Sequence, residues 1–217
     1  MWELTWMHLK LSFAATAIAC LVALPVGIWL GHIGRYQLLA TSTSNIGRAV
    51  PALGLVVFFI AFLGVGFLNV WVALVLLAIP PIITNSYVGI RGVDPETVDA
   101  GRGNGLTERQ LALKVELPLT LPTIMSGVRI SLVSVIATAT IAPLANVDTL
   151  GRPIISASVY GTDGRLAACI AVALVTLAAD GVFALLQRTV TPRGLKLHAS
   201  KRSLGRPAFP AAKRSIR

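Results

Sequence analysis

Charged residues and cysteines are scarce in this sequence. Lys, Arg, Asp and Glu together make up 13% of the 217 residues, about half the share that is usual in a soluble domain. Only two cysteines occur, Cys20 and Cys169, and both fall in apolar stretches, so they indicate neither a disulfide framework nor a metal site. Because 55% of the residues are hydrophobic, the low charge predicts an integral membrane protein.

Catalytic motifs are missing as well. His8, His32 and His198 are far apart in the sequence and form no catalytic group. No stretch matches G-x-x-x-x-G-K-[ST], the loop through which many proteins hold the phosphates of ATP. We therefore expect no enzymatic activity, no metal and no cofactor in this chain, and any work driven by ATP would need a separate subunit.

Two long stretches carry no charge, with 24 residues between Lys10 and Arg35 and 42 between Arg48 and Arg91. A helix needs about 20 apolar residues to cross a bilayer, so the first stretch fits one span and the second fits two. A cleaved signal peptide is the alternative for the first span, but its apolar run is too long and no cleavage site follows it. The sequence predicts an all-α transmembrane domain over residues 1–190 with five spans, near residues 11–33, 46–64, 68–90, 121–143 and 165–187.

Basic residues are distributed unevenly between the two sides of this predicted topology. Of the 19 Lys and Arg, 15 lie in the loops after the first and third spans or after the last span. Basic residues favour the cytoplasmic side, which predicts a multi-pass plasma-membrane protein with its N-terminus outside and its C-terminus inside. The net charge of +10 then requires no nucleic acid. We interpret residues 191–217 as a disordered basic tail that touches anionic lipid, with partner binding as the alternative.

A polar segment separates the third and fourth spans. Asp94 suits a helix N-cap and Pro95 suits the first helical position. Asn104-Gly105 is typical of a helix end, with the glycine in a left-handed conformation. This pattern predicts a first short helix.

A second short helix is expected directly afterwards. Thr107 and Gln110 have the spacing of a capping box, which begins a helix, and Leu117-Pro118 should end it. We call residues 94–118 the elbow and expect it on the cytoplasmic side.

Small residues are concentrated in the first helix of the elbow. Ala100, Gly101 and Gly105 would let another backbone approach closely. A polar rim of Asp99, Arg102 and Arg109 would border that bare surface. Such a helix suits insertion into a groove of a soluble partner. The alternative is that the helix packs on the cytoplasmic ends of its own spans.

The elbow resembles the cytoplasmic signature loop of ABC-importer permeases, which reads E-A-A, three residues, G, nine residues, I-x-L-P. The matching positions in this sequence are Asp99, Ala100, Gly101, Gly105, Val115, Leu117 and Pro118. Asp replaces Glu, Gly replaces the second Ala, and Val replaces Ile. The resemblance implies that residues 91–120 form a coupling loop that sits in a groove of a separate ATPase subunit, with Arg102 at its border.

Three further stretches, residues 50–66, 80–105 and 117–144, resemble the osmoprotectant branch of this family, whose permeases import glycine betaine, carnitine or choline. The loop "ANVDTLG" (residues 145–151) departs from the "GAGGLG" that is common there. The resemblance implies three partners: the ATPase, a second permease chain that is identical or related, and an extracytoplasmic substrate-binding protein. The alternatives are an importer of an amino acid such as methionine, an ion-driven secondary transporter or channel, and a membrane scaffold.

Two charges interrupt the predicted fourth and fifth spans. Arg129 and Asp180 should lie at similar depth, and charges inside a membrane usually pair or face a cavity. We hypothesise that they form an ion pair that ties the two helices together. The alternative is that one or both line the transport pathway.

A polar cluster follows the proline pair Pro80-Pro81. Thr84, Asn85, Ser86 and Tyr87 would lie beside a kink and could line a translocation path. If Tyr87 lines it, its ring could attract a quaternary ammonium group. The alternative is ordinary hydrogen bonding between helices.

Overall fold

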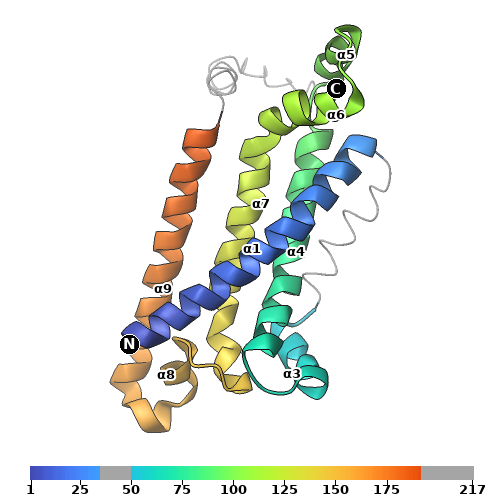
Figure 1. Cartoon of the computed structure of the whole chain (residues 1–217). Helices are drawn as coiled ribbons and strands as arrows, with labels where there is room; N and C mark the ends of the chain where they lie inside the picture. The colour runs from blue at the N-terminus through green and yellow to red at the C-terminus, as the bar shows by residue number, and fades with distance from the viewer. Residues whose placement is uncertain (35–49, 192–217) are drawn as a thin grey trace, which may run out of the picture.

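The computed structural model describes residues 1–34 and 50–191, which fold almost entirely into helices (Figure 1). The elements are α1 (Trp2–Ile33), α3 (Ala52–Leu63), α4 (Phe67–Arg91), α5 (Pro95–Gly103), α6 (Glu108–Leu111), the π-helical turn η1 (Ala112–Glu116), α7 (Leu117–Thr138), the 3₁₀ segment η2 (Ala139–Ala145), α8 (Gly151–Ile155) and α9 (Ala157–Val190). These residues contain no strand, so the predicted all-α fold is confirmed. The predicted basic tail lies outside the described residues, apart from Thr191 at its start.

Four helical segments in the described part of the chain are long and apolar enough to cross a bilayer: α1, α4, the continuous run Glu108–Ala145 and α9. The expected second span is different. Over its described part the structure has only α3, whose 12 residues reach about 18 Å, less than the bilayer core of about 30 Å. Pro51 stands before α3 and Gly64, with φ of 71°, ends it. Residues 46–49 of the predicted second span lie outside the described residues.

The long helices place the elbow and the N-terminus at opposite ends of the molecule (Figure 1). Helices α5 and α6 lie at the end where α4 finishes, α7 begins and α9 finishes. The short helices α3 and α8 lie at the other end, and α8 lies near the start of α1. The relative positions of these ends are those expected from the sequence.

Helix α1 crosses α4 closely because its buried face is built from small residues. At Gly27 an added Cβ would come within 2.7 Å of the Ser86 Cβ, and at Gly31 within 2.8 Å of the Ile90 Cβ. Small residues allow helix backbones to approach closely in a membrane. The buried small residues recur every fourth position: Ala15, Ala19, Ala23, Gly27 and Gly31.

Side-chain hydrogen bonds to carbonyl groups join the other helices. The Ser131 hydroxyl of α7 donates to the Ala78 carbonyl of α4 at 2.7 Å, and the Gln187 amide of α9 donates to the Pro122 carbonyl of α7 at 2.7 Å. Most of α9 is otherwise exposed, since only Ala168 is buried along its length. This helix therefore presents an apolar surface for lipid or another chain.

Candidate functional site

The first helix of the elbow begins and ends as its sequence predicts. The Asp94 carboxylate accepts a hydrogen bond from the Glu96 backbone N–H at 3.0 Å, and Pro95 is the first residue of α5. Asn104 caps the C-terminal end, and Gly105 follows with φ of 80°. Both helix signals are confirmed.

The second helix begins as predicted but does not end where expected. The Gln110 N–H donates to the Thr107 hydroxyl at 3.3 Å, and the Thr107 N–H donates to the Gln110 side chain at 3.0 Å, which completes the capping box. The chain then stays helical through η1 into α7, so Leu117-Pro118 does not stop it. A proline is tolerated in the first turn of a helix, where its missing N–H leaves no bond unmade, and the wider π-turn before it adjusts the hydrogen-bond ladder.

The structure distributes the residues of the signature over two surfaces of the elbow. Gly101 is buried, and a Cβ there would lie 2.6 Å from the Leu111 Cδ1. Its missing side chain therefore leaves room for the Leu111 side chain, through which α5 packs on α6 within this chain. Exposed on the outside are Asp99, Ala100, Arg102 and Gly105, while Val115, Leu117 and Pro118 are half-buried.

An ion-pair network stabilises the outer surface of the elbow. The Arg102 guanidinium contacts both carboxylate oxygens of Glu108, at 3.0 and 3.3 Å, and also reaches Asp99 at 3.2 Å. The hydrogen bond from Arg102 holds the pKa of Glu108 below its usual range. This network links α5 to α6.

Three residues of this region, His32, Glu108 and Glu116, are absent from the predicted site residues. His32, in the last turn of α1, places its Nδ1 2.7 Å from the Glu116 carboxylate and its Nε2 3.3 Å from that of Glu108. Glu116 is only 5% exposed. An acidic residue between the apolar Val115 and Leu117 is the one signal in the sequence that could have pointed to a buried partner.

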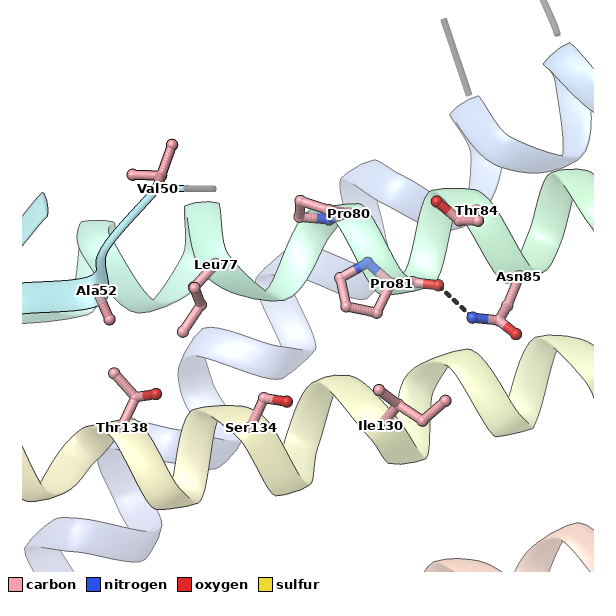
Figure 2. Close-up of a pocket in the computed structure, with 10 residues that line it drawn as sticks. All are labelled: Val50, Ala52, Leu77, Pro80, Pro81, Thr84, Asn85, Ile130, Ser134 and Thr138. Carbon is pink, nitrogen blue, oxygen red and sulfur yellow. Dashed lines mark hydrogen bonds between the residues drawn. The ribbon is translucent and has the colours of Figure 1, made fainter. Parts of the chain in front are cut away.

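A cavity of about 370 Å³ lies between α4 and α7 (Figure 2). Its volume is within the range of small-molecule pockets. The described residues that line it carry hydroxyl, amide and aliphatic groups and no charge: Val50, Ala52, Leu77, Pro80, Pro81, Thr84, Asn85, Ile130, Ser134 and Thr138. Such a surface offers hydrogen-bonding groups but no charge to a small molecule.

The structure brings only two of the four residues after the proline pair to this cavity. Thr84 and Asn85 line it, and the Asn85 amide donates to the Pro81 carbonyl at 2.8 Å (Figure 2). Ser86 and Tyr87 are buried and are not among the lining residues. Helix α4 continues through both prolines to Arg91.

Arg129 and Asp180 meet between α7 and α9. The Arg129 Nε and Nη2 donate to the two carboxylate oxygens of Asp180, each at 2.5 Å. Neither residue lines the cavity. A two-point contact of this kind fixes the relative position of two helices as well as their charges.

The loop with the atypical sequence folds back onto η2. Thr149 donates to the Ala139 carbonyl at 2.9 Å, and a Cβ at Gly151 would lie 1.7 Å from the Thr140 carbonyl oxygen. Only glycine fits at that position. The loop thus has a glycine, Gly151, at the position where the backbone leaves no room for a side chain. It lies at the end of the molecule opposite to the elbow (Figure 1).

Comparison with protein families matches residues 23–193 to the family described as "Binding-protein-dependent transport system inner membrane component". The match covers α3–α9, including the elbow, the cavity and the ion pair, together with the last turns of α1.

Individual relatives span most of the chain. The carnitine transport permease protein OpuCB of Listeria monocytogenes is 35% identical over 88% of this chain and 88% of its own length. The glycine betaine/carnitine/choline transport system permease protein OpuCB of Bacillus subtilis (strain 168) is 34% identical over 88% and 89%. Among solved structures, the MetNI methionine ABC transporter in an inward-facing conformation has a chain with a TM-score of 0.76, at 22% identity, over 88% of this chain and 95% of that one. That structural likeness concerns the fold alone.

Proposed function

The chain belongs to the family of inner membrane components of binding-protein-dependent transport systems, and from this premise we propose that it is the permease subunit of an ATP-driven importer for a small osmoprotectant. Glycine betaine, carnitine and choline are the proposed substrates, because relatives above 30% identity over most of the chain carry those names. The chain itself forms the path, and a separate ATPase supplies the energy.

The observation that carries this proposal is the outer surface of the elbow. Asp99, Ala100, Arg102 and Gly105 are exposed together at one end of the molecule, while the network of Arg102 and Glu108 holds α5 in place. A short helix with a small residue at its centre and charges at its border fits a groove on a soluble partner. Movement of that partner would then reach α4 and α7, the helices that line the cavity, as a rigid-body displacement.

The distribution of basic residues supports a cytoplasmic position for this end. Arg91, Arg102, Arg109 and Lys114 are all exposed around the elbow, as the preference of basic residues for the cytoplasmic side requires. Since α1 begins at the opposite end (Figure 1), the proposal assigns the N-terminus to the outside. The loop at 145–151 then faces the extracytoplasmic binding protein.

A second permease chain, identical or related, completes the path. One chain lines the cavity with α4, α7 and residues 50 and 52, and two-fold assembly is the common way to enclose a central site. The exposed apolar residues of α9, among them Leu174 and Leu177, supply surface for such a contact or for lipid.

Affinity purification of the tagged chain from native membranes in mild detergent tests the proposal. We expect a P-loop ATPase, a permease chain and an extracytoplasmic binding protein to be recovered together, and the ligand of that binding protein to be a quaternary amine. Recovery of the chain alone, repeated after cross-linking, would contradict an ATP-driven importer and favour an ion-driven secondary transporter.

A pair of variants ties the result to the elbow. Ala100→Arg adds a long charged side chain to the exposed surface of α5, and it should abolish recovery of the ATPase. Ser158→Arg makes the same kind of change at an exposed position at the other end of the molecule, and recovery of the ATPase should persist. Equal recovery of the ATPase with both variants would move its docking site away from the elbow.

A further inference from the structure

A line of polar contacts joins the end of α1 to the elbow. His32 lies in the last turn of α1 and stands between two carboxylates, with its Nδ1 2.7 Å from Glu116 and its Nε2 3.3 Å from Glu108. Glu108 is the first residue of α6 and Glu116 is the last residue of η1. One imidazole ring therefore bridges the two ends of the second elbow helix.

This bridge joins one imidazole ring to two carboxyl groups. Each ring nitrogen of His32 faces a carboxylate oxygen, and both ring nitrogens and carboxylates are hydrogen-bonding groups. Charge-assisted hydrogen bonds of this kind are stronger than neutral ones. The Glu116 side chain is 7% exposed and the His32 side chain is 17% exposed. If either side chain were removed, little water could reach the other to replace the lost hydrogen bond.

The line continues outward from Glu108. Its carboxylate also accepts from Arg102, which in turn contacts Asp99 on the exposed surface of α5. Five side chains thus connect α1 with the surface that the proposed function assigns to the ATPase: His32, Glu116, Glu108, Arg102 and Asp99.

This connection matters because α1 does not adjoin the elbow in the sequence. The elbow continues directly into α4 and α7, whereas His32 and Glu116 are 84 positions apart in the chain. On its other side the end of α1 lies against α4, where the Arg91 guanidinium occupies the space beside Gly34. The acidic partners of His32 both come from the elbow and not from α4.

We infer that His32 is a positioning residue that holds the elbow on the end of α1, so that a movement of the elbow displaces α1 together with α4 and α7. The inference rests on the proposed function, because it assigns the elbow to the coupling of ATP hydrolysis to transport. It adds α1 to the helices that move with the elbow. The residue responsible, His32, is not one of the positions of the signature loop.

The test uses the assembled importer reconstituted in lipid, with its binding protein and substrate. In His32→Ala we expect the ATPase to remain bound and basal ATP hydrolysis to persist, while substrate transported per ATP falls by about fivefold or more, the usual size of a coupling between sites. Hydrogen–deuterium exchange at residues 107–117 should rise in the same variant. His32→Arg supplies two N–H donors again and should recover most of the lost coupling.

Lys10→Ala is the matched control, since it removes an exposed cation from the opposite end of α1 and should change neither readout. If His32→Ala does not accumulate, Glu108→Gln can take its place, because it changes one of the two carboxylates that contact His32 at a side chain that is 60% exposed. This variant should also lower the amount of substrate transported per ATP. Normal transport per ATP and normal exchange in the alanine variant would overturn the inference, as would an arginine variant that is equally impaired.

Failure of this inference is distinguishable from failure of the proposed function. If no ATPase accompanies the wild-type chain, the proposed function is wrong. The exchange measurement needs only the purified chain, so it still decides whether His32 holds the elbow. Unchanged exchange in His32→Ala would then reject the positioning role by itself.

Discussion

At the scale of single residues, Arg129 and Asp180 place opposite charges inside two apolar helices. Their two hydrogen bonds of 2.5 Å satisfy both groups at once, and such groups are costly in a membrane when they have no partner. Since neither residue lines the cavity, we propose that the pair holds α9 against α7 and does not contact the solute.

The first prediction concerns this pair. Asp180→Asn and Arg129→Gln should each reduce the amount of folded, monodisperse chain recovered from membranes, because each leaves one charge without its counter-ion. The double variant should recover most of the loss. Fluorescence-detected size exclusion measures the result, with Asp163→Asn, an exposed acid near the start of α9, as control. Normal recovery of both single variants would contradict the structural role.

A second prediction follows from the lack of space at Gly101. A Cβ there would lie 2.6 Å from the Leu111 Cδ1, so Gly101→Ala should destabilise the elbow by about 1–3 kcal/mol, the usual cost of overpacking. Leu111→Val removes the atom in question, and the double variant should therefore lose less than the sum of the single changes.

Gly103→Ala is the control for this measurement, because it lies in the same helix and has nothing within 4 Å of its added Cβ. It should be neutral or slightly stabilising. Thermal unfolding of the purified chain compares the four variants. A Gly101→Ala chain as stable as the Gly103→Ala chain would show that α5 does not pack on Leu111 as described.

Residues in contact across long sequence distances were the hardest to predict. The sequence places Arg129 and Asp180 at similar depth because hydropathy defines the two spans around them, and that is enough to suggest a pair. No comparable measure relates His32 to Glu116, since both lie at helix ends whose relative position depends on how α1 crosses α4.

At the scale of elements, the elbow was predictable where its signals are local. The caps at Asp94 and Thr107 depend on contacts within three residues, so their sequence patterns are sufficient. The predicted end of the second helix was wrong, because a proline such as Pro118 breaks a helix only when it lies in the helix interior. Here the π-turn η1 places it in the first turn of α7.

A third prediction concerns the pH dependence of this element. The hydrogen bond from Arg102 lowers the pKa of Glu108, so the contact stabilises the elbow above the ordinary glutamate pKa of about 4.3 and loses that contribution as the pH falls from there through the lowered pKa. Amide protection at residues 107–111, corrected for intrinsic exchange rates, should accordingly decline below about pH 4.3.

Two variants define the origin of that change. Glu108→Gln should remove this part of the pH dependence, and Arg102→Gln should shift the decline to higher pH because the pKa of Glu108 returns towards its ordinary value. A decline that is identical in wild type and Glu108→Gln would assign the effect to another carboxylate.

At the scale of the whole molecule, apolar composition predicted the class of the protein and the positions of α1, α4, α7 and α9. It did not predict the length of α3, because hydropathy does not register where a backbone leaves the helical conformation. Pro51 and Gly64 bound that helix, whereas the uncharged stretch of the sequence extends over residues 49–90.

The arrangement of the helices explains how one small chain would serve as part of a pump. The cavity lies between α4 and α7, and the elbow joins these same two helices at the proposed cytoplasmic end (Figure 1). In the proposed function, a displacement of the elbow would act directly on the walls of this cavity. The inferred role of His32 would extend that displacement to α1.

Uptake of radiolabelled substrate into proteoliposomes that contain the purified importer tests the central claim most directly. We predict that glycine betaine, carnitine or choline accumulates only when ATP and the binding protein are present, that ionophores leave this uptake intact, and that Ala100→Arg abolishes it. Uptake that follows a proton or sodium gradient without ATP would contradict the account, and ATP-driven uptake of methionine in place of these compounds would contradict its assignment of the substrate.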